Sequence, residues 1–314
     1  MPQLHSHSYY ITTLGCPKNE ADSRAMEESL LREGFRPASR PEVAELHLIN
    51  TCAFIESARV ETIETTLTAL AVREKKQPAQ KVILAGCFAE RYKENIASDL
   101  PEIDFAFGTG QYHRAGQLIG ERFGRPQGAI IPYARPHRPG QVHAYVKVAD
   151  GCNRACHFCA IPRFRGPFQA DSRENILREV EQLKEQGVRE IALVSQDTNN
   201  WSNPENFLDL LEAIRLTYPE GWLRLLYMYP DRRTYRIFEG IARRGIDIVP
   251  YLESPLQHTA PHVLKAMNRQ GDASFYGELF HMARELFPGL EIRTAFIIGY
   301  EGETRSDVDH LIDF

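Results

Sequence analysis

Length, composition and charge already exclude several broad classes of protein. One hydrophobic core rarely serves a chain of 314 residues, so this length predicts two domains. Hydrophobic residues make up 43% of the chain and charged residues 25%, which is typical of a folded globular protein and excludes a disordered one. The net charge of −5 gives no overall positive field toward nucleic acid or an anionic membrane.

Targeting and membrane signals are missing from the sequence. No apolar run reaches the length of a membrane span. The start MPQLHSHSYY lacks the basic residues and the apolar core of a signal peptide. We therefore expect a cytoplasmic protein without a membrane partner, in which the six cysteines serve a metal or a reaction rather than disulfides.

Strand-like runs alternate with helical patterns over the first 123 residues. We expect strands at about 9–15, 45–51, 81–86 and 105–110, and helices at about 19–34, 54–73, 89–97 and 112–122. Such alternation predicts a parallel sheet with helices on its faces. Cys16, Cys52 and Cys87 each follow a predicted strand. Because ligands of open α/β sheets bind at the carboxyl ends of the strands, we expect these three cysteines to converge at one edge.

A second alternating region follows a segment that is rich in proline and glycine. That segment, residues 124–141, has no sustained period and is predicted to be a linker. The later strands are expected at about 144–150, 190–196, 222–228, 247–253 and 291–300, and the helices near 173–186, 206–216, 232–244, between 261 and 287, and from 303. Five such β/α units predict a partial TIM-like barrel with its active site on the loops after the strands.

Three further cysteines lie close together directly after the first strand of this second region. Cys152, Cys156 and Cys159 stand in GCNRACHFCAIP, and thiols at gaps of four and three residues can face one metal centre. A structural zinc ion takes four ligands, so a zinc site would need a distant residue or His157. A disulfide with one spare thiol is a further alternative, which a reducing cytosol disfavours.

The C-x3-C-x2-C loop resembles that of the radical S-adenosylmethionine enzymes. In that superfamily three cysteines hold a 4Fe–4S cluster, whose open iron binds S-adenosylmethionine before it is cleaved to a 5′-deoxyadenosyl radical. The resemblance implies this cluster at Cys152, Cys156 and Cys159 and S-adenosylmethionine as a cofactor. It also places Ser195 and Gln196, at the end of the second barrel strand, against the amino group of S-adenosylmethionine. Helix capping is the alternative role for these two side chains.

Motifs of the first region resemble the amino-terminal domain of the methylthiotransferases, a branch of the radical S-adenosylmethionine enzymes. The segments that carry the resemblance are LGCPKNEADS, INTCAFIESA and AGCFAERY. Cys16, Cys52 and Cys87 occupy the three positions at which that family binds a second, auxiliary 4Fe–4S cluster. The resemblance therefore implies an enzyme with two clusters, which is consistent with the convergence expected from the sheet.

This family also implies a domain organisation. Residues 1–123 correspond to the amino-terminal methylthiotransferase domain, 124–141 to the linker, and 142–314 to the radical S-adenosylmethionine barrel. The last residues, SDVDHLIDF, keep helical spacing and contain no stop signal. Because family members continue into a final barrel unit and a small TRAM domain, we expect the sequence to be truncated before them.

Two segments separate the branches of the family. VSQDT at 194–198 and PLQH at 255–258 resemble the RimO-type aspartate methylthiotransferases rather than the transfer-RNA branch. The implied reaction adds a methylthio group to the β-carbon of an aspartate in the small-subunit ribosomal protein S12. An electron donor such as flavodoxin or ferredoxin is implied as well. A transfer-RNA adenosine methylthiotransferase and a non-catalytic metal-binding scaffold remain the alternatives.

Basic residues outside these motifs allow two interpretations each. Arg163 and Arg165 follow the cysteine loop and are expected either to hold a carboxylate or to support the loop. The clusters DRRTYR at 231–236 and ARRG at 242–245 are typical of solvated helix faces, but a local patch of this kind also attracts RNA.

Overall fold

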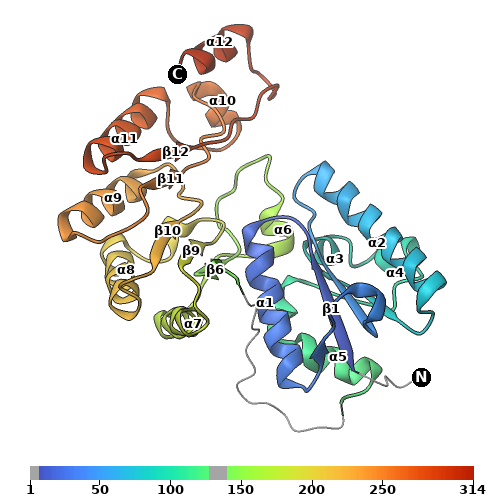
Figure 1. The fold of residues 1–314 in the computed structure, drawn as a ribbon. Helices are drawn as coiled ribbons and strands as arrows, with labels where there is room; N and C mark the ends of the chain where they lie inside the picture. The colour runs from blue at the N-terminus through green and yellow to red at the C-terminus, as the bar shows by residue number, and fades with distance from the viewer. Residues whose placement is uncertain (1–6, 127–139) are drawn as a thin grey trace. The chain divides into compact units, whose positions relative to one another are not determined.

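The computed structural model describes residues 7–126 and 140–314, which form two compact units (Figure 1). The first unit comprises Met1–Pro139 together with Arg163–Arg165. The second comprises Gly140–Pro162 and Gly166–Phe314. Most of the predicted linker at 124–141 lies outside the described residues.

A five-stranded sheet forms the centre of the first unit (Figure 1). Its strand order is β2-β1-β3-β4-β5, and all pairings are parallel, as the alternating pattern predicts. The strands are β1 (Ser8–Thr13), β2 (Arg36–Pro37), β3 (Leu46–Thr51), β4 (Lys81–Gly86) and β5 (Phe105–Phe107). The sequence did not predict β2, since two residues carry no periodicity, and its proline is tolerated because the strand lies at the edge.

Helices cover both faces of this sheet because successive side chains along each strand point to opposite sides. Leu48 packs with α1 and α5 on one face, and Ile49 packs with α2 and α4 on the other (Figure 1). The helices are α1 (Pro17–Arg32), α2 (Glu56–Lys76), α3 (Cys87–Arg91), α4 (Ile96–Asp99) and α5 (Ala115–Phe123), with 3-10 turns at η1 (Pro41–Val43) and η2 (Thr109–Arg114).

One predicted helix of the first unit is wrong in its extent. Instead of a single helix at 89–97, α3 ends at Arg91 and α4 begins at Ile96. Between them the backbone N–H of Asn95 donates to the carbonyl of Tyr92 at 2.9 Å and closes a turn. Asparagine favours turns over helix interiors, because its side chain competes for backbone hydrogen bonds.

The second unit alternates strands and helices in the predicted order. Strands β10-β9-β6 form one parallel sheet, β11-β12 a parallel pair, and β7-β8 a short antiparallel pair. The strands are β6 (His143–Lys147), β7 (Ala149–Asp150), β8 (Gln169–Ala170), β9 (Glu190–Val194), β10 (Trp222–Leu225), β11 (Tyr251–Glu253) and β12 (Glu291–Arg293). The strand expected at 247–253 begins only after Pro250, which has no N–H for the ladder.

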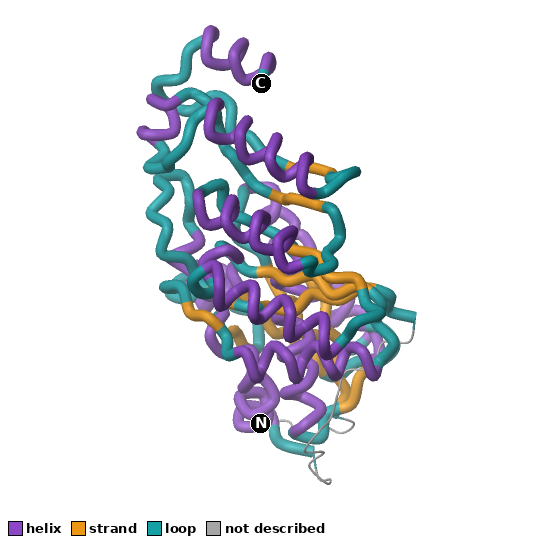
Figure 2. The backbone as a smooth tube through the Cα atoms, turned by 90° about the vertical axis from the view of Figure 1, so that its left-hand side faces the viewer, coloured by secondary structure: helices purple, strands orange, loops and turns teal. Residues whose placement is uncertain are grey.

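Helices of the second unit follow one another along one side of these strands, as Figure 2 shows. Their buried side chains, among them Ile176, Phe207 and Phe238, form the core against Val146 and Leu193 of the strands. The helices are α7 (Arg173–Glu185), α8 (Pro204–Thr217), α9 (Arg232–Arg244), α10 (Pro261–Ala266), α11 (Ala273–Leu286) and α12 (Arg305–Asp313), with a 3-10 turn at η3 (Thr198–Asn200). The short helix α6 (Ile161–Arg165) begins in this unit, and its residues Arg163–Arg165 belong to the first unit. Over the described residues, every helix is too short or too polar to span a membrane.

Candidate functional site

Three cysteines follow neighbouring strands of the first unit. Strands β1, β3 and β4 lie side by side and run parallel. Cys16 is the N-cap of α1 after β1, Cys52 follows β3 directly, and Cys87 follows β4 as the first residue of α3. The carboxyl ends of the three strands meet at the same edge of the sheet, so the predicted convergence of these cysteines is confirmed.

Two glycines allow the cysteine-bearing turns to approach one another closely. Gly15 has a φ of +89°, and a Cβ at this position would lie 2.6 Å from Cβ of Cys52 and 2.8 Å from its Sγ. Gly86 has a φ of +96°, and its Cβ would lie 2.5 Å from Oδ1 of Asn50. A side chain is therefore excluded at both positions by conformation and by space.

Buried polar side chains tie these turns together. Asn19 donates through Nδ2 to the carbonyl of Thr51 at 3.1 Å, and its Oδ1 accepts from Sγ of Cys16 at 3.8 Å. Thr51 donates through Oγ1 to the carbonyl of Ala85 at 2.6 Å and accepts from the N–H of Phe88 at 3.1 Å. The turns after β1, β3 and β4 are thus held in place by hydrogen bonds as well as by the sheet.

Arg165 brings a guanidinium group to the same edge of the sheet. Its Nη1 donates to Oδ2 of Asp22 at 2.7 Å, and the two side chains are only 2% and 0% exposed. Of the two roles expected for this arginine, the structure contains the carboxylate contact. Burial raises the pKa of the Cys87 thiol to about 12, and Arg165, which hydrogen-bonds this thiol, opposes the rise.

The second group of thiols lies in the loop between β7 and α6. The N–H of Arg154 donates to Sγ of Cys152 at 3.3 Å, and the N–H of Cys159 donates to the carbonyl of Cys156 at 3.0 Å. Burial is the main cause that raises the pKa of the Cys152 thiol to about 11, and the neighbouring thiols of Cys159 and Cys156 contribute to the rise. The three thiols thus lie within one loop of eight residues.

The turn that follows α10 also holds the cysteine loop in place. Asn268 donates through Nδ2 to the carbonyl of Ala155 at 2.8 Å, and Arg269 donates through Nη1 to Sγ of Cys156 at 3.6 Å. Asn268 has a φ of 54°, a left-handed conformation that asparagine tolerates better than most residues. The loop geometry thus depends on residues more than 100 positions away, because the hydrogen bonds span 113 residues.

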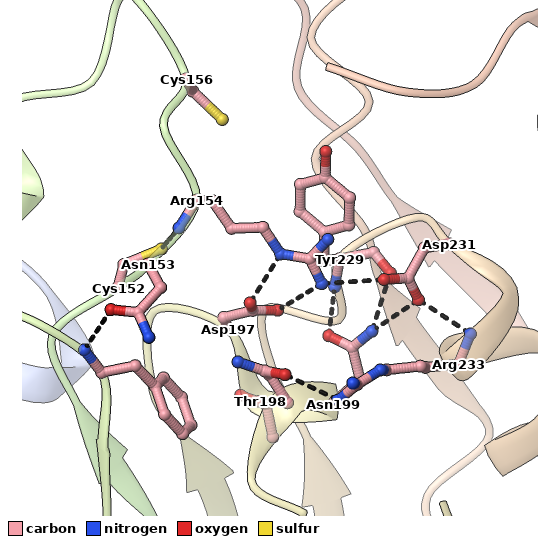
Figure 3. A network of polar contacts seen from close by, with 12 residues as sticks. Cys152, Asn153, Arg154, Cys156, Asp197, Thr198, Asn199, Tyr229, Asp231 and Arg233 are labelled. Atoms are coloured by element: carbon pink, nitrogen blue, oxygen red, sulfur yellow. Dashed lines mark hydrogen bonds and ion pairs between the residues drawn. The ribbon is translucent and has the colours of Figure 1, made fainter. Parts of the chain in front are cut away.

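Arg154 links the cysteine loop to carboxylates at the ends of neighbouring strands (Figure 3). Its Nε lies 2.7 Å from Oδ2 of Asp197, and its Nη2 lies 2.8 Å from Oδ2 of Asp231. The guanidinium carbon also lies 3.7 Å from the centroid of the Tyr229 ring, and Asn199 donates to Oδ1 of Asp231 at 2.9 Å. Burial raises the pKa of Asp197, and the hydrogen bonds from Arg154 oppose this effect.

Removing Arg154 is expected to destabilise the protein strongly. In Arg154→Gln, Asp197 would stay buried, at 1% exposure, without its cation. Breaking a buried pair in this way costs about 3 kcal/mol of unfolding free energy, whereas Arg243→Gln, which removes an exposed pair with Glu205, costs less than about 1 kcal/mol. Urea denaturation of both variants tests this, and equal midpoints would contradict a structural role for the Arg154 network.

Ser195 and Gln196 follow β9 and lie near the start of the cysteine loop. Ser195 is fully buried, and its Oγ accepts from the N–H of Asp197 at 3.0 Å. Gln196 donates through Nε2 to Oδ1 of Asp150 at 3.2 Å, while its buried Oε1 has no hydrogen-bond partner among the described residues. Since buried acceptors are rarely left unpaired, this oxygen fits an N–H donor of a ligand, and contact with S-adenosylmethionine stays a prediction.

The chemistry of the donors is compatible with iron–sulfur clusters. Within residues 7–126 and 140–314, no group of three or more His, Cys, Asp or Glu side chains is arranged to hold a single metal ion. Over the described residues no disulfide joins any of the six cysteines, and Nδ1 of His157 bonds to the carbonyl of Ala266 at 2.7 Å. Cysteine thiolates are the ligands of 4Fe–4S clusters, so both sets of three thiols have the donor chemistry that such clusters need.

Comparisons with known proteins establish the family. Residues 8–108 match the uncharacterized protein family UPF0004, and residues 146–314 match the radical SAM superfamily. The ribosomal protein uS12 methylthiotransferase RimO of Leptospira biflexa is 43% identical over 98% of this chain and 70% of its own length. The chain belongs to the RimO family of radical S-adenosylmethionine methylthiotransferases. The RimO protein of Carboxydothermus hydrogenoformans is 33% identical over 98% of this chain and 72% of its own length.

A solved structure supports the fold. The radical S-adenosylmethionine methyltransferase TsrM from Kitasatospora setae, with tryptophan and a SAM analogue bound, matches with a TM-score of 0.71. The match covers 98% of this chain and 70% of that one at 14% identity, so it bears on the fold alone. The α/β fold with a radical SAM domain and the resemblance to the RimO branch, both predicted from the sequence, are confirmed.

The basic clusters of α9 have partners within the second unit of this RimO family member. Arg244 forms ion pairs with acidic residues of α8, namely Glu205, Asp209 and Glu212. Asp231, the first residue of the DRRTYR segment, caps α9 by accepting from the N–H groups of Arg233 and Thr234. The solvated-helix interpretation therefore fits ARRG at 242–245 better than an RNA-binding patch does, because Arg244 is paired with acidic residues. Asp231 belongs to the Arg154 network.

Proposed function

We propose that this protein binds two 4Fe–4S clusters and S-adenosylmethionine and transfers a methylthio group to ribosomal protein uS12. The observation that carries the proposal is that its six cysteines form two sets of three, one in each of the two matched regions. Relatives that are 33–43% identical over 98% of the chain are named ribosomal protein uS12 methylthiotransferase, which supports uS12 as the substrate.

The second unit would carry the radical chemistry. Cys152, Cys156 and Cys159 would hold a cluster with one open iron, which together with S-adenosylmethionine supplies the 5′-deoxyadenosyl radical. Arg154 holds the backbone of this loop in place through its two carboxylate contacts. The unpaired Oε1 of Gln196 would accept from the amino group of S-adenosylmethionine and orient it.

The first unit would carry the auxiliary cluster. Cys16, Cys52 and Cys87 would bind it at the edge of the sheet, where the resemblance to the family places the sulfur that becomes methylated. The acceptor in this proposal is the β-carbon of a uS12 aspartate, whose C–H bond is far too weakly acidic for a side-chain base. The site therefore needs no catalytic histidine or carboxylate for that step. We further propose a cytoplasmic enzyme that takes electrons from a donor such as flavodoxin or ferredoxin.

The mass of the product tests this proposal. The protein would be reconstituted with iron and sulfide under anaerobic conditions and incubated with S-adenosylmethionine, a reductant, small ribosomal subunits and transfer RNA. We expect uS12 to gain the mass of one methylthio group on an aspartate, with transfer RNA unchanged.

Two other outcomes contradict the proposal in different ways. A methylthio group on transfer-RNA adenosine would favour the other branch of the family. An unmodified uS12, together with intact S-adenosylmethionine and a fully metallated protein, would favour the non-catalytic scaffold. The Cys152→Ala variant is the matched control, since it should fold and yet leave both macromolecules unmodified.

A further inference from the structure

A buried arginine lies among the three cysteines of the first unit. Arg165 belongs to this unit, although it follows Cys159 by only six positions in the sequence. Its side chain is 2% exposed, and its guanidinium carbon lies 6.0 Å from the centroid of the Tyr112 ring. Desolvating a charged group to this extent is costly, so its surroundings must hold it in a defined place.

Hydrogen bonds fix the guanidinium beside Cys16. Arg165 donates through Nη2 to Oδ1 of Asn19 at 2.8 Å, and the Sγ of Cys16 donates to the same oxygen at 3.8 Å. The other nitrogen, Nη1, is held by Asp22 at 2.7 Å. Asn19 also donates to the carbonyl of Thr51, the residue before the second cysteine. One arginine is thereby connected to two of the three cysteine-bearing turns.

The second cysteine of the first unit lies close to the same hydrogen-bonded group. A Cβ on Gly15 would lie 2.8 Å from Sγ of Cys52 and 3.2 Å from Nδ2 of Asn19, so Cys52 lies close to the amide that Arg165 binds. Asp22, which is fully buried, is the anion that pairs with Arg165 at this edge of the sheet. The cysteine-bearing turns thus have one buried cation, Arg165, and one buried anion, Asp22, beside them.

We propose that Arg165 is a positioning residue that sets the reduction potential of the auxiliary cluster. The proposal rests on the function proposed above, because it requires Cys16, Cys52 and Cys87 to bind that cluster. Local charge and hydrogen bonds to the sulfur atoms set the potential of a protein-bound cluster. A reduced cluster carries one more negative charge, so the Arg165 guanidinium favours the reduced form and raises the potential. Asp22 lowers it.

Redox titration of the auxiliary cluster alone tests this role. The parent protein would carry alanine at Cys152, Cys156 and Cys159, so that only the first unit holds iron. Midpoint potentials would be followed by electron paramagnetic resonance in the parent and in Arg165→Gln, Asp22→Asn and the double variant. The exposed Arg163, on the same short helix α6, provides the matched control Arg163→Gln.

The expected shifts have opposite signs. Arg165→Gln should lower the potential enough to change the ratio of reduced to oxidised cluster about tenfold, which is about 59 mV for one electron. Asp22→Asn should raise it, the double variant should return toward the parent, and Arg163→Gln should match the parent.

The outcomes separate this inference from the function on which it rests. A parent protein without iron would contradict the auxiliary cluster itself. Full iron content with an unshifted potential in Arg165→Gln would contradict only the role of Arg165. If Arg165→Gln does not bind iron, the midpoint potentials of Asp22→Asn and Arg165→Lys test the role of Arg165 instead. An unshifted Asp22→Asn would overturn the inference, whereas a raised potential in Asp22→Asn with a near-parent value in Arg165→Lys would support it.

Discussion

Replacing Cys152, Cys156 and Cys159 with alanine is expected to remove about four of about eight irons per chain and to abolish cleavage of S-adenosylmethionine, because one 4Fe–4S cluster needs these thiolates. The thiols lie together in one loop, which is held by the contact of Arg154 with Asp197 and by the hydrogen bond from Asn268 to the carbonyl of Ala155. The substitutions leave both contacts in place, so the loop should keep its shape without the metal. Iron and sulfide analysis after anaerobic reconstitution, with detection of 5′-deoxyadenosine, measures both effects.

The metal content of the unmodified protein is the control for this experiment. Zinc bound in place of iron after anaerobic preparation would contradict the account, since a closed zinc site leaves no position for S-adenosylmethionine. Cleavage of S-adenosylmethionine at the normal rate in the triple variant would contradict it as well.

Replacing Cys16, Cys52 and Cys87 with alanine should separate the two activities. We again expect about four irons per chain, because the second set of thiolates remains. Cleavage of S-adenosylmethionine should persist, whereas transfer of the methylthio group to uS12 should fall below detection. Each substitution removes one sulfur atom from a turn that Asn19 and Thr51 hold by other hydrogen bonds, so the unit should stay folded. Quantifying 5′-deoxyadenosine and the mass of uS12 in one reaction measures both activities.

The variant of the barrel cysteines is the matched control for this prediction. Both variants carry three cysteine-to-alanine changes and should lose the same amount of iron, yet only one should retain cleavage. Loss of cleavage in both would contradict the assignment of one cluster to each set of cysteines.

The sequence predicts the position of the candidate site because strand periodicity and motif order are local signals. Cys16, Cys52 and Cys87 each follow a run of strand residues, and parallel strands bring such positions to one edge of a sheet. The order β2-β1-β3-β4-β5 places the three relevant strands next to one another. The loop with Cys152 carries its own spacing, so its position after the first strand of the second unit was predictable too.

The contacts around the thiols could not be predicted, because they join residues that are distant in the sequence. Arg165 and Asp22 are 143 positions apart, and Arg154 reaches Asp231 across 77. A basic residue shows no preference in the sequence for one carboxylate over another. A partial signal did exist for Asp231, whose place just before a predicted helix is typical of an N-cap.

Strand lengths were overestimated in the second unit for a related reason. Apolar runs at 222–228 and 291–300 indicated long strands, whereas β10 and β12 have four and three residues. Burial in a β/α unit makes residues beyond the hydrogen-bonded ladder apolar as well, so hydrophobicity alone does not mark where pairing ends.

The most direct test of the account is the electron paramagnetic resonance spectrum of the reduced barrel cluster, recorded with and without S-adenosylmethionine. The variant with alanine at Cys16, Cys52 and Cys87 isolates this cluster. The account predicts that S-adenosylmethionine changes the spectrum, because Cys152, Cys156 and Cys159 leave one iron open to it. A spectrum that stays the same at saturating S-adenosylmethionine would show that no iron is open and would contradict the proposed reaction.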